Sequence, residues 1–480
     1  MATTMMTTTV MATTVMATTM MATLRKACAA VVAAILAAAL VAACGGQGGS
    51  STNGTIEYWL WDSAQQPGYQ KCADAFQQAN PGLRIHISQY GWDDYWSKLT
   101  AGFIADTAPD VFTDHLSKYA QFVDLKVLRP LDNYAATSDI QDTDYQQGLA
   151  ELWKGQDGKR YGAPKDWDTI AMFYNQATLQ AAGVDPGDLQ NLSWNPQDGG
   201  TFEKMIAHLT IDTNGVRGDQ PGFDKTKVRT YGFGSDGSGG ASWGQTQWSA
   251  FTGSAGWQAT DRNPWGGHFN LDQPALQDTL RWYFGLAAKG YMPGFEEIGG
   301  NNPVGPDKQI QSGIAALALS GSWMISTFSN LTDAAGKKLQ IGIAPTPIGP
   351  TGKRASMFNG LADSITTLSK QPESAAKWVK FLSGEQCQDI IGQSGVVFPA
   401  RQKGTELAIA FNKNERELDV SPFTNQVKDG TTFLFPVTTN AADIKALMQP
   451  RLDGIYIGSS PIDSLTDLNN QLNDLFKVAQ

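Results

Sequence analysis

The chain has 480 residues, of which 36 are Lys or Arg and 46 are Asp or Glu, so its formal net charge is −10. This acidic balance argues against a nucleic-acid ligand and against a polybasic membrane patch. The length is sufficient for two ordinary domains or one large one. The 14 Trp, 13 Tyr and 21 Phe supply many aromatic surfaces, although core packing is the default role of any single ring.

The first 43 residues have the features of a targeting segment. Residues 1–20 repeat Met-Ala-Thr-Thr without charge or apolar periodicity, so we exclude them from the fold, and Met21 can serve as the start. Two cations, Arg25 and Lys26, then precede an apolar run that ends in small residues. This is the pattern of a secretory signal, and the run is shorter than the ~20 residues that a membrane span requires. We therefore expect residues 1–43 to be a signal peptide.

Cys44 follows the small residues Val41-Ala42-Ala43 directly. This arrangement resembles a bacterial lipoprotein box, in which the cysteine is lipidated and becomes the mature N-terminus. Lipid on Cys44 would anchor the domain to the extracellular face of the cell membrane. Residues 44–54 are rich in Gly and Ser, so we expect a flexible linker there. Removal of the signal would also remove Arg25 and Lys26 and make the mature charge more acidic.

The segment after the linker alternates strands and helices. Thr55–Leu60, Leu83–Ile87 and a run beginning at Asp110 are rich in β-branched or aromatic residues and predict three strands. Between them, apolar residues at i, i+3, i+4 and i+7 predict two helices, which begin near residues 69 and 93. Strand, helix, strand, helix, strand is typical of an α/β unit with a largely parallel sheet.

The same alternation recurs later in the chain. Residues 170–174 and 314–319 predict strands, and residues 202–209 predict a helix. Pro372 begins a further helix that should end at Gly384. Residues 235–270 are rich in Gly, Ser and Trp, which indicates long surface loops and short helices, where functional groups are often found.

Several stretches resemble one family. Residues 75–85, the run Ala-Pro-Asp-Val-Phe at 108–112, and Tyr-Gly-Ala-Pro-Lys at 161–165 followed by Phe-Tyr-Asn at 173–175 are similar to segments of the extracellular solute-binding proteins of sugar transporters, family 1. Residues 313–323, which end in Gly-Ser-Trp, and Ile-Ala-Pro at 343–345 continue the series. The resemblance runs in order over residues 55–480, so the spacing makes the match strong although each motif alone is weak.

The resemblance implies an α/β, two-lobed fold like that of periplasmic binding proteins such as maltose-binding protein, with hinge strands and a central ligand cleft. By this analogy, lobe 1 would comprise residues 55–165 and about 361–405. Lobe 2 would comprise residues 166–360 and about 406–480. The implied function is delivery of a mono- or oligosaccharide to the permease subunits of an ABC importer, with ATPase subunits on the far side of the membrane. We expect a monomer without a cofactor.

Enzyme motifs are weak in this chain. The histidines at 86, 115, 208 and 268 show no short metal-ligand spacing, and no Gly-x-Ser-x-Gly elbow is present. A glycosidase needs two carboxylates close together, and a sequence with 46 acids does not exclude such a pair, so a secreted glycoside hydrolase is the alternative function. A third alternative is the same fold with a phosphorylated polyol or a peptide as ligand. The net negative charge disfavours an anionic ligand.

Two local features leave alternatives open. Cys72 and Cys387 could form one disulfide in an oxidising compartment, or they could be buried free thiols on helices. Asp212-Thr213-Asn214-Gly215, followed by Asp219 and Asp224, has oxygen ligands at loop spacing, but no Glu stands at the twelfth position of a calcium loop. A solvated turn is therefore preferred over a calcium site, and we predict no metal.

A neutral sugar needs aromatic plates for its C–H faces and fixed polar groups for its hydroxyls. Such groups should stand at the carboxyl ends of strands and at the lobe crossovers, where α/β clefts form. We expect no catalytic residue. The candidate ligand-binding residues are Trp59, Trp61, Asp62, Tyr90, Trp92, Asp114, His115, Asp166, Trp167, Asp168, Trp323, Phe358, Asn359 and Phe435.

Two of these candidates have the strongest support. Trp323 matches the stacking aromatic that follows Gly-Ser in the family. Counting back from Tyr174-Asn175 favours Asp168 as the ligand-binding acid of the first crossover, and Asp166 remains an alternative. His115, Tyr90 and Phe435 have weaker support, because most isolated aromatic rings are packed in a core.

Overall fold

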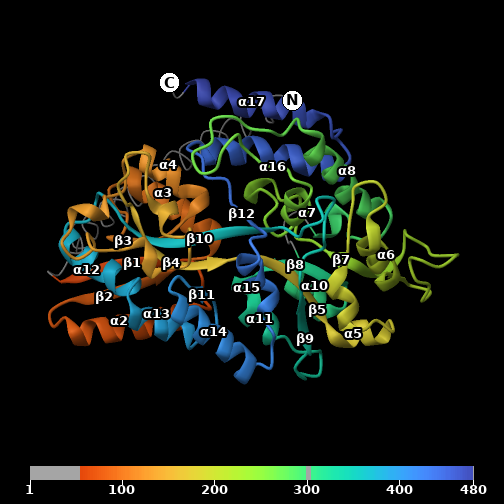
Figure 1. Ribbon diagram of the computed structural model, residues 1–480, viewed down its shortest axis with the longest axis horizontal. Coiled ribbons are helices and arrows are strands. Elements are labelled where there is room, and N and C mark those ends of the chain that lie inside the picture. The colour runs from red at the N-terminus through yellow and green to blue at the C-terminus, as the bar shows by residue number, and fades with distance from the viewer. Residues whose placement is uncertain (1–53, 299–303, 479–480) are drawn as a thin grey trace, which may run out of the picture. The chain divides into compact units, whose positions relative to one another are not determined.

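The computed structural model describes residues 54–298 and 304–478. The predicted signal peptide, Cys44 and nearly all of the predicted linker therefore lie outside the described residues. No helix in the described part of the chain combines the length and apolar character needed to cross a membrane. Within the unit Ile56–Gln480, the strands form two main sheets (Figure 1). The buried apolar residues form two clusters, and the first of them includes residues of both sheets, such as Phe112 of the larger and Phe173 of the smaller.

The larger sheet has the strand order β11-β4-β10-β3-β1-β2, with β12 paired to β10. β1 and β3 are parallel, whereas β10 is antiparallel to both β3 and β4. Figure 1 shows α2, α12 and α13 beside these strands. The strands are β1 (Thr55–Leu60), β2 (Arg84–Gln89), β3 (Val111–His115), β4 (Gly162–Asp168), β10 (Ser356–Ile365), β11 (Phe398–Pro399) and β12 (Thr432–Leu434).

The smaller sheet has the strand order β6-β7-β8-β5-β9. β7 and β8 are parallel, and the β5–β8, β5–β9 and β6–β7 pairs are antiparallel. The strands are β5 (Ile170–Asn175), β6 (Ile211–Asp212), β7 (Val228–Gly234), β8 (Ala315–Gly321) and β9 (Ile341–Ala344). The three strands that were predicted first, β1, β2 and β3, lie together in the larger sheet, and β1 and β3 are parallel as expected. Neither sheet is largely parallel as a whole, because β10 is antiparallel to β3 and β4, and β5 is antiparallel to β8 and β9.

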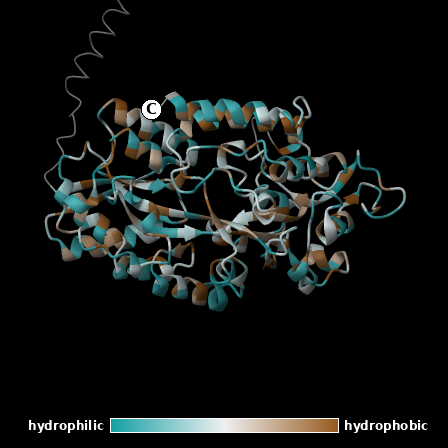
Figure 2. Ribbon diagram, turned by 45° about the horizontal axis from the view of Figure 1, so that its top comes forward, coloured by the Kyte–Doolittle hydropathy of each residue, from teal (hydrophilic) through white to brown (hydrophobic). Residues whose placement is uncertain are grey.

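The predicted helices and strands are present near their expected positions. For example, α12 begins at Pro372 and ends at Leu382, two residues before Gly384. Figure 2 shows hydrophilic and hydrophobic residues alternating along the helices, as expected of helices that cover a core with one face. The α-helices are α2 (Gln66–Ala79), α3 (Trp92–Ile104), α4 (Leu116–Asp124), α5 (Gln176–Ala181), α6 (Gly200–Leu209), α7 (Ser249–Ser254), α8 (Pro274–Ala288), α9 (Phe295–Ile298), α10 (Pro306–Ser312), α11 (Ile325–Ser329), α12 (Pro372–Leu382), α13 (Glu385–Gly392), α14 (Gln402–Glu415), α15 (Ser421–Lys428), α16 (Ala441–Ile457) and α17 (Ser464–Val478).

Short 3₁₀ helices connect several of these elements. They are η1 (Leu131–Asn133), η2 (Asp142–Asp144), η3 (Glu151–Trp153), η4 (Pro186–Asn191), η5 (Gly240–Ser242) and η6 (Ser322–Met324). Two of them carry the chain close to the predicted site. η5 precedes the turn that leads to α7 and that contains Gln245. η6 follows β8 directly and contains Trp323.

Aromatic rings build both cores. In the first core, Phe76 of α2 packs edge-on against Trp378 of α12, with ring centroids 5.1 Å apart. In the second, Trp194 stacks on Trp282 of α8 at 5.0 Å. The first core also contains Phe423 and Val437, from the segment after residue 406 that the sequence analysis assigned to lobe 2. Most of the aromatic residues therefore have a packing role.

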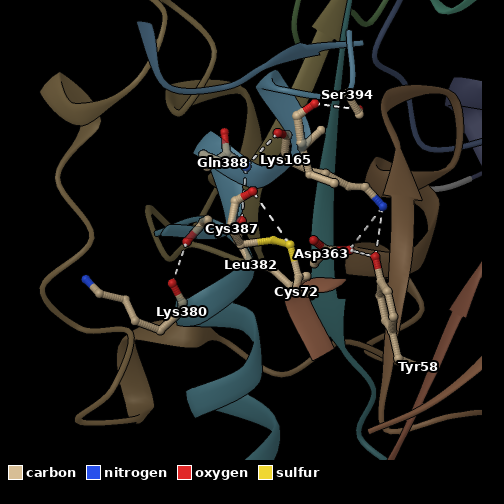
Figure 3. Close-up of a disulfide and its surroundings, with 11 residues drawn as sticks. Tyr58, Cys72, Lys165, Asp363, Lys380, Leu382, Cys387, Gln388 and Ser394 are labelled. Carbon is tan, nitrogen blue, oxygen red and sulfur yellow. Dashed lines mark hydrogen bonds and ion pairs between the residues drawn. A yellow bond between two sulfur atoms is a disulfide. The ribbon is translucent and has the colours of Figure 1, made fainter. Parts of the chain in front are cut away.

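A disulfide joins Cys72 of α2 to Cys387 of α13, two residues 315 positions apart in sequence (Figure 3). Of the two alternatives left open by the sequence, the structure has the bridge. Nearby, Lys165 is buried, and its Nζ donates to Tyr58 Oη at 2.8 Å and to Thr113 Oγ1 at 2.6 Å. The same Nζ lies 3.8 Å from Asp363 Oδ1, so the buried charge has an ionic partner.

Candidate functional site

Four predicted aromatic side chains come together at the ends of strands in the larger sheet. Trp61, after β1, has its ring 5.1 Å from that of Trp92 and 6.1 Å from that of His115. His115 ends β3, and its ring lies 5.3 Å from Trp92 and 5.6 Å from Phe435. Trp92 is the most exposed of the four, at 42%. The four rings form one connected cluster, which we call the aromatic cluster.

Trp59 and Tyr90 form a separate pair with ring centroids 5.0 Å apart. Both are half-buried, and the Tyr90 backbone N donates to Leu60 O at 3.2 Å. Trp59 lies within β1, whereas Trp61 is the first residue after it. Trp61 reaches the aromatic cluster, whereas Trp59 packs with Tyr90 beside it.

A chain of buried polar contacts adjoins the aromatic cluster. Asn359 Nδ2 donates to Asp168 Oδ2 at 3.0 Å and lies 2.9 Å from His115 Nε2. Gln245 Nε2 donates to Asp168 Oδ1, also at 3.0 Å. The backbone N of Ser117 donates to His115 Nδ1 at 3.0 Å, which fixes the ring at the start of α4. Both carboxyl oxygens of Asp168 thus have a side-chain donor.

Strand pairing explains why these residues meet. In the β4–β10 ladder, Asn359 lies opposite Asp168, and Leu361 lies opposite Asp166. Both predicted acids are buried, but their surroundings differ. Asp168 has two amide donors, whereas Asp166 Oδ2 has no hydrogen-bond partner among the described residues. The geometry therefore connects Asp168, rather than Asp166, to the predicted site.

Burial controls the ionisation of this group of residues. It raises the pKa of Asp168 well above its usual value, against the opposing effect of the Asn359 hydrogen bond. It also raises the pKa of Asp166 to about 7, with the Lys165 charge opposing, and that of Asp114 to about 8. For His115, burial lowers the pKa to about 3, so the imidazole is neutral at physiological pH.

Trp323 reaches the same region from the smaller sheet. The β5–β8 ladder sets Gly321 opposite Ile170, and the Ser322 backbone N donates to Thr169 O at 3.1 Å. Thr169 follows Asp168 directly, so the turn that carries Trp323 is bonded to the residue next to the acid. The indole is half-buried and packs against apolar groups of both cores. The two best-supported candidates therefore lie on adjoining segments.

Other predicted residues lie away from this group. Trp167 points to the opposite face of β4, where its ring lies 4.9 Å from that of Phe398 and 5.9 Å from that of Phe358. Both Trp167 and Phe358 are core residues. Asp114 is fully buried and accepts from Ser364 Oγ at 3.2 Å. Asp62 accepts from Ala64 N and Gln65 Nε2 in a local turn.

Gln245 is a candidate that was not among the residues predicted from the sequence. It lies in the Gly-, Ser- and Trp-rich segment, for which the composition predicted surface loops. That expectation was partly wrong, because Trp243, Trp248 and Trp257 are buried in the second core. Trp248 Nε1 donates to Ser238 O at 2.9 Å, which helps to hold the turn before α7 in place. Nothing in the local composition distinguishes Gln245 from the neighbouring Gln247.

The described residues contain no group of three or more His, Cys, Asp or Glu side chains arranged to hold a metal ion. In the segment considered for calcium, Asp212 accepts from the backbone N of Asn214, Val216 and Asp224, so its carboxylate stabilises a turn. Two cavities of about 350 and 400 Å³ lie elsewhere and include none of the predicted site residues. Of these, the smaller is lined by Trp282, Arg281 and Lys289 among others.

The comparisons with known proteins agree with this architecture. Residues 71–415 match the model of the bacterial extracellular solute-binding protein family. A putative binding protein of Brucella abortus is 22% identical over 406 residues, which cover 83% of this chain and 87% of that protein. The lactose-binding protein of Rhizobium radiobacter is 28% identical over 153 residues, covering 30% of this chain and 34% of its own.

Among solved structures, an ABC substrate-binding protein from Listeria monocytogenes in complex with cycloalternan superposes with a TM-score of 0.72. The two chains are 17% identical, and the match covers 88% of this chain and 99% of the other. A likeness at this identity shows the fold. The family match extends over more than half of the chain, and the protein therefore belongs to the bacterial extracellular solute-binding proteins. Its α/β fold is two-lobed, as the resemblance implied.

Proposed function

We propose that the protein binds a neutral mono- or oligosaccharide outside the cell and delivers it to the permease subunits of an ABC importer. The observation that carries this proposal is the polar chain at Asp168, which lies beside the Trp323 turn. Asn359 Oδ1, in the middle of that chain, is buried and has no hydrogen-bond partner among the described residues. Such an atom costs free energy unless a partner is supplied, and a sugar hydroxyl could supply one.

The chemistry of the surrounding side chains favours a neutral ligand. Trp61, Trp92 and Trp323 provide apolar surfaces for the C–H faces of a sugar ring. Lys165, on the same strand as Asp168, is buried and already has Tyr58 and Asp363 as partners. The names of two related proteins, one that binds lactose and one solved with cycloalternan, give further support for a saccharide.

The glycoside hydrolase alternative has less support. Retaining and inverting glycosidases need one carboxyl group free to transfer a proton and another free to act as nucleophile or base. At this site both oxygens of Asp168 already accept from amide side chains. Because the chain belongs to a family of binding proteins, we propose a binding subunit without catalytic activity.

A thermal-shift screen over mono- and oligosaccharides, beginning with lactose, tests the proposal. A ligand that binds only the folded protein stabilises it by RT ln(1 + [L]/Kd), which is about 2.7 kcal/mol at one hundred times Kd. We expect at least one neutral saccharide to raise the unfolding temperature without being altered. Release of a shorter product during incubation would favour the hydrolase. Stabilisation by sugar phosphates or peptides alone would favour the third alternative.

We also propose that Cys44 carries the lipid that holds the protein on the extracellular face of the membrane, and that residues 45–54 are a spacer. The support is the sequence pattern Val41-Ala42-Ala43-Cys44. Replacing Cys44 by Ala should abolish metabolic labelling with a fatty acid and reduce retention in the membrane fraction. Labelling and retention equal to those of the wild type would contradict the proposal. We further propose a monomer, whose lobes divide at the chain crossings near residues 164–168, 359–364 and beyond about 405.

A further inference from the structure

Gly321 ends β8, two residues before Trp323. Its backbone has φ −87° and ψ 162°, an extended conformation that any L-residue can adopt. The conformational freedom of glycine is therefore not needed here. The reason for a glycine at this position must lie in what occupies the space that a side chain would fill.

That space is filled by the Trp323 indole. A Cβ placed on Gly321 would lie 1.8 Å from Cζ3 and 2.1 Å from both Cε3 and Cη2 of Trp323. These separations are far below any non-bonded contact between carbon atoms, whose optimum is about 3.5–4.0 Å. The six-membered ring of the indole thus lies where the first atom of a side chain would stand, and any residue larger than glycine must displace it.

The backbone around this contact has little freedom to adjust. Gly321 pairs with Ile170 in the β5–β8 ladder, and the Ser322 N–H is bonded to Thr169 O. These contacts tie the turn to the segment that carries Asp168. Because the backbone is held, a methyl group at residue 321 should be accommodated by rotation of the indole away from the end of the strand.

We propose that Gly321 is a positioning residue for ligand binding, because its missing side chain lets the Trp323 ring lie on the end of β8 in the orientation that presents it to a sugar. The inference rests on the proposed function for its effect on affinity. Its structural part, the dependence of ring placement on residue 321, does not. The two parts can therefore be tested separately.

The first test needs no ligand. The protein is labelled with 5-fluorotryptophan, and the ¹⁹F resonance of Trp323 is assigned by its loss in the Trp323→Phe variant. We expect Gly321→Ala to shift this resonance while most of the other tryptophan resonances stay in place. Gly285→Ala in α8 is the matched control, since no heavy atom lies within 4 Å of the added methyl group. An unmoved Trp323 resonance in Gly321→Ala would overturn the inference.

The second test measures affinity by calorimetric titration with lactose and with the saccharide that gives the largest thermal shift. Gly321→Ala should weaken binding at least tenfold, and Gly285→Ala should leave it unchanged. In a Trp323→Ala background, where the space is empty, Gly321→Ala should cause less than a twofold further loss. Losses that multiply in the double variant would show that Gly321 acts independently of the indole and would overturn the inference.

Two further outcomes, a Gly321→Ala variant that does not fold and a wild-type protein that binds no saccharide, also test the inference. If Gly321→Ala does not fold, the Gly321→Ala/Trp323→Ala double variant should fold, because truncation of the indole clears the contact. A double variant that also fails to fold would place the cause in the backbone and contradict the inference. If the wild-type protein binds no saccharide, the proposed function fails. The fluorine resonance would still decide whether residue 321 controls the placement of the ring.

Discussion

At the scale of single residues, Asp168 is distinguished by the two amide groups that donate to it. Each of its carboxyl oxygens accepts one hydrogen bond, from Gln245 on one side and from Asn359 on the other. An asparagine at this position could accept only one of them, and its own NH₂ group would face a second donor. Replacing each acid by asparagine therefore compares Asp168 with Asp166, the other candidate for the ligand-binding acid.

We predict that Asp168→Asn weakens saccharide binding at least tenfold, about 1.4 kcal/mol, because it removes one acceptor from the polar chain. Asp166→Asn on the same strand is the matched control and should change affinity much less, since the hydrogen bonds from Gln245 and Asn359 go to Asp168 and not to Asp166. Calorimetric titration of the folded variants makes the comparison. A larger loss in Asp166→Asn would assign the ligand-binding role to Asp166 instead.

Trp323→Ala should also weaken binding at least tenfold, because it removes the apolar plate that the ligand would cover, at about 25 cal/mol per Å² of buried area. The variant should fold, since the ring is only half-buried. Circular dichroism checks folding, and titration with the same saccharide measures the loss. Affinity within twofold of the wild type would mean that the sugar does not stack on this ring.

His115 should make the protein less stable in mild acid. Its folded-state pKa, about 3, lies below the unfolded value near 6.5, so only the unfolded chain takes up this proton between these pH values. Stability from this residue is complete above pH 6.5 and falls as the pH falls, by about 2 kcal/mol at pH 5. His115→Gln cannot titrate, and its denaturation midpoint should therefore fall less than that of the wild type between pH 7.5 and pH 5.

The buried acids have the opposite effect, because a raised pKa favours the folded state at low pH. The comparison with His115→Gln is needed for this reason, since the total pH dependence sums all of these groups. Equal changes in the wild type and the variant over this pH range would show that His115 is protonated in the folded protein.

Sequence reasoning located the candidates at strand ends but could not separate ligand-facing rings from packed ones. Trp61, Trp92 and His115 meet in one cluster, as their positions after consecutive strands suggested. Trp167, only one residue from Asp168, faces the opposite side of its strand and packs on Phe398. Gln245 could not be predicted, because its contact depends on how a long turn packs against distant parts of the chain.

At the scale of elements, the helices and strands followed from apolar periodicity and turn residues, but their pairing did not. Antiparallel β10, inserted between β3 and β4, pairs with residues that lie between 191 (Asn359 with Asp168) and 254 (Ile365 with Val111) positions earlier in the chain. Local patterns carry no information about such distant partners, so the mixed character of the sheet was missed. The same limit applied to Cys72 and Cys387, whose helices become neighbours only in the folded chain.

The disulfide between α2 and α13 should contribute substantially to stability. It closes a very long loop, and removal of a native disulfide of this kind costs about 2–5 kcal/mol. We predict that Cys72→Ala/Cys387→Ala lowers the free energy of unfolding by an amount in this range, measured by chemical denaturation. Part of the loss will come from the two small cavities left by the sulfur atoms.

A thiol reductant separates the effect of breaking the disulfide from the effect of the cavities, because it breaks the bond without removing the sulfur atoms. The wild-type protein unfolded and refolded with a thiol reductant should lose most of the same stability, whereas the double variant should be insensitive to it. A wild-type protein whose stability is the same with and without reductant would contradict a stabilising role for the bridge.

At the scale of the whole molecule, the candidate site draws its side chains from both lobes. Asp168, Asn359 and the aromatic cluster belong to or adjoin the larger sheet, whereas Trp323 follows a strand of the smaller sheet and Gln245 lies in a turn that packs on the second core. A ligand held by this set must contact both lobes at once. Binding should therefore restrict the opening of the two lobes together rather than that of one alone.

Hydrogen exchange of the backbone amides tests this expectation. At saturating saccharide, we predict slower exchange in two separate regions: the start of α3 around Trp92 in the lobe of the larger sheet, and the turn from residue 235 to α7 in the lobe of the smaller sheet. Amides of α17, which carries none of the candidate residues, provide the control and should slow only as far as global unfolding is suppressed. Protection confined to one of the two regions would mean that the ligand rests on a single lobe, because a ligand bound between the lobes excludes water from both surfaces that it contacts.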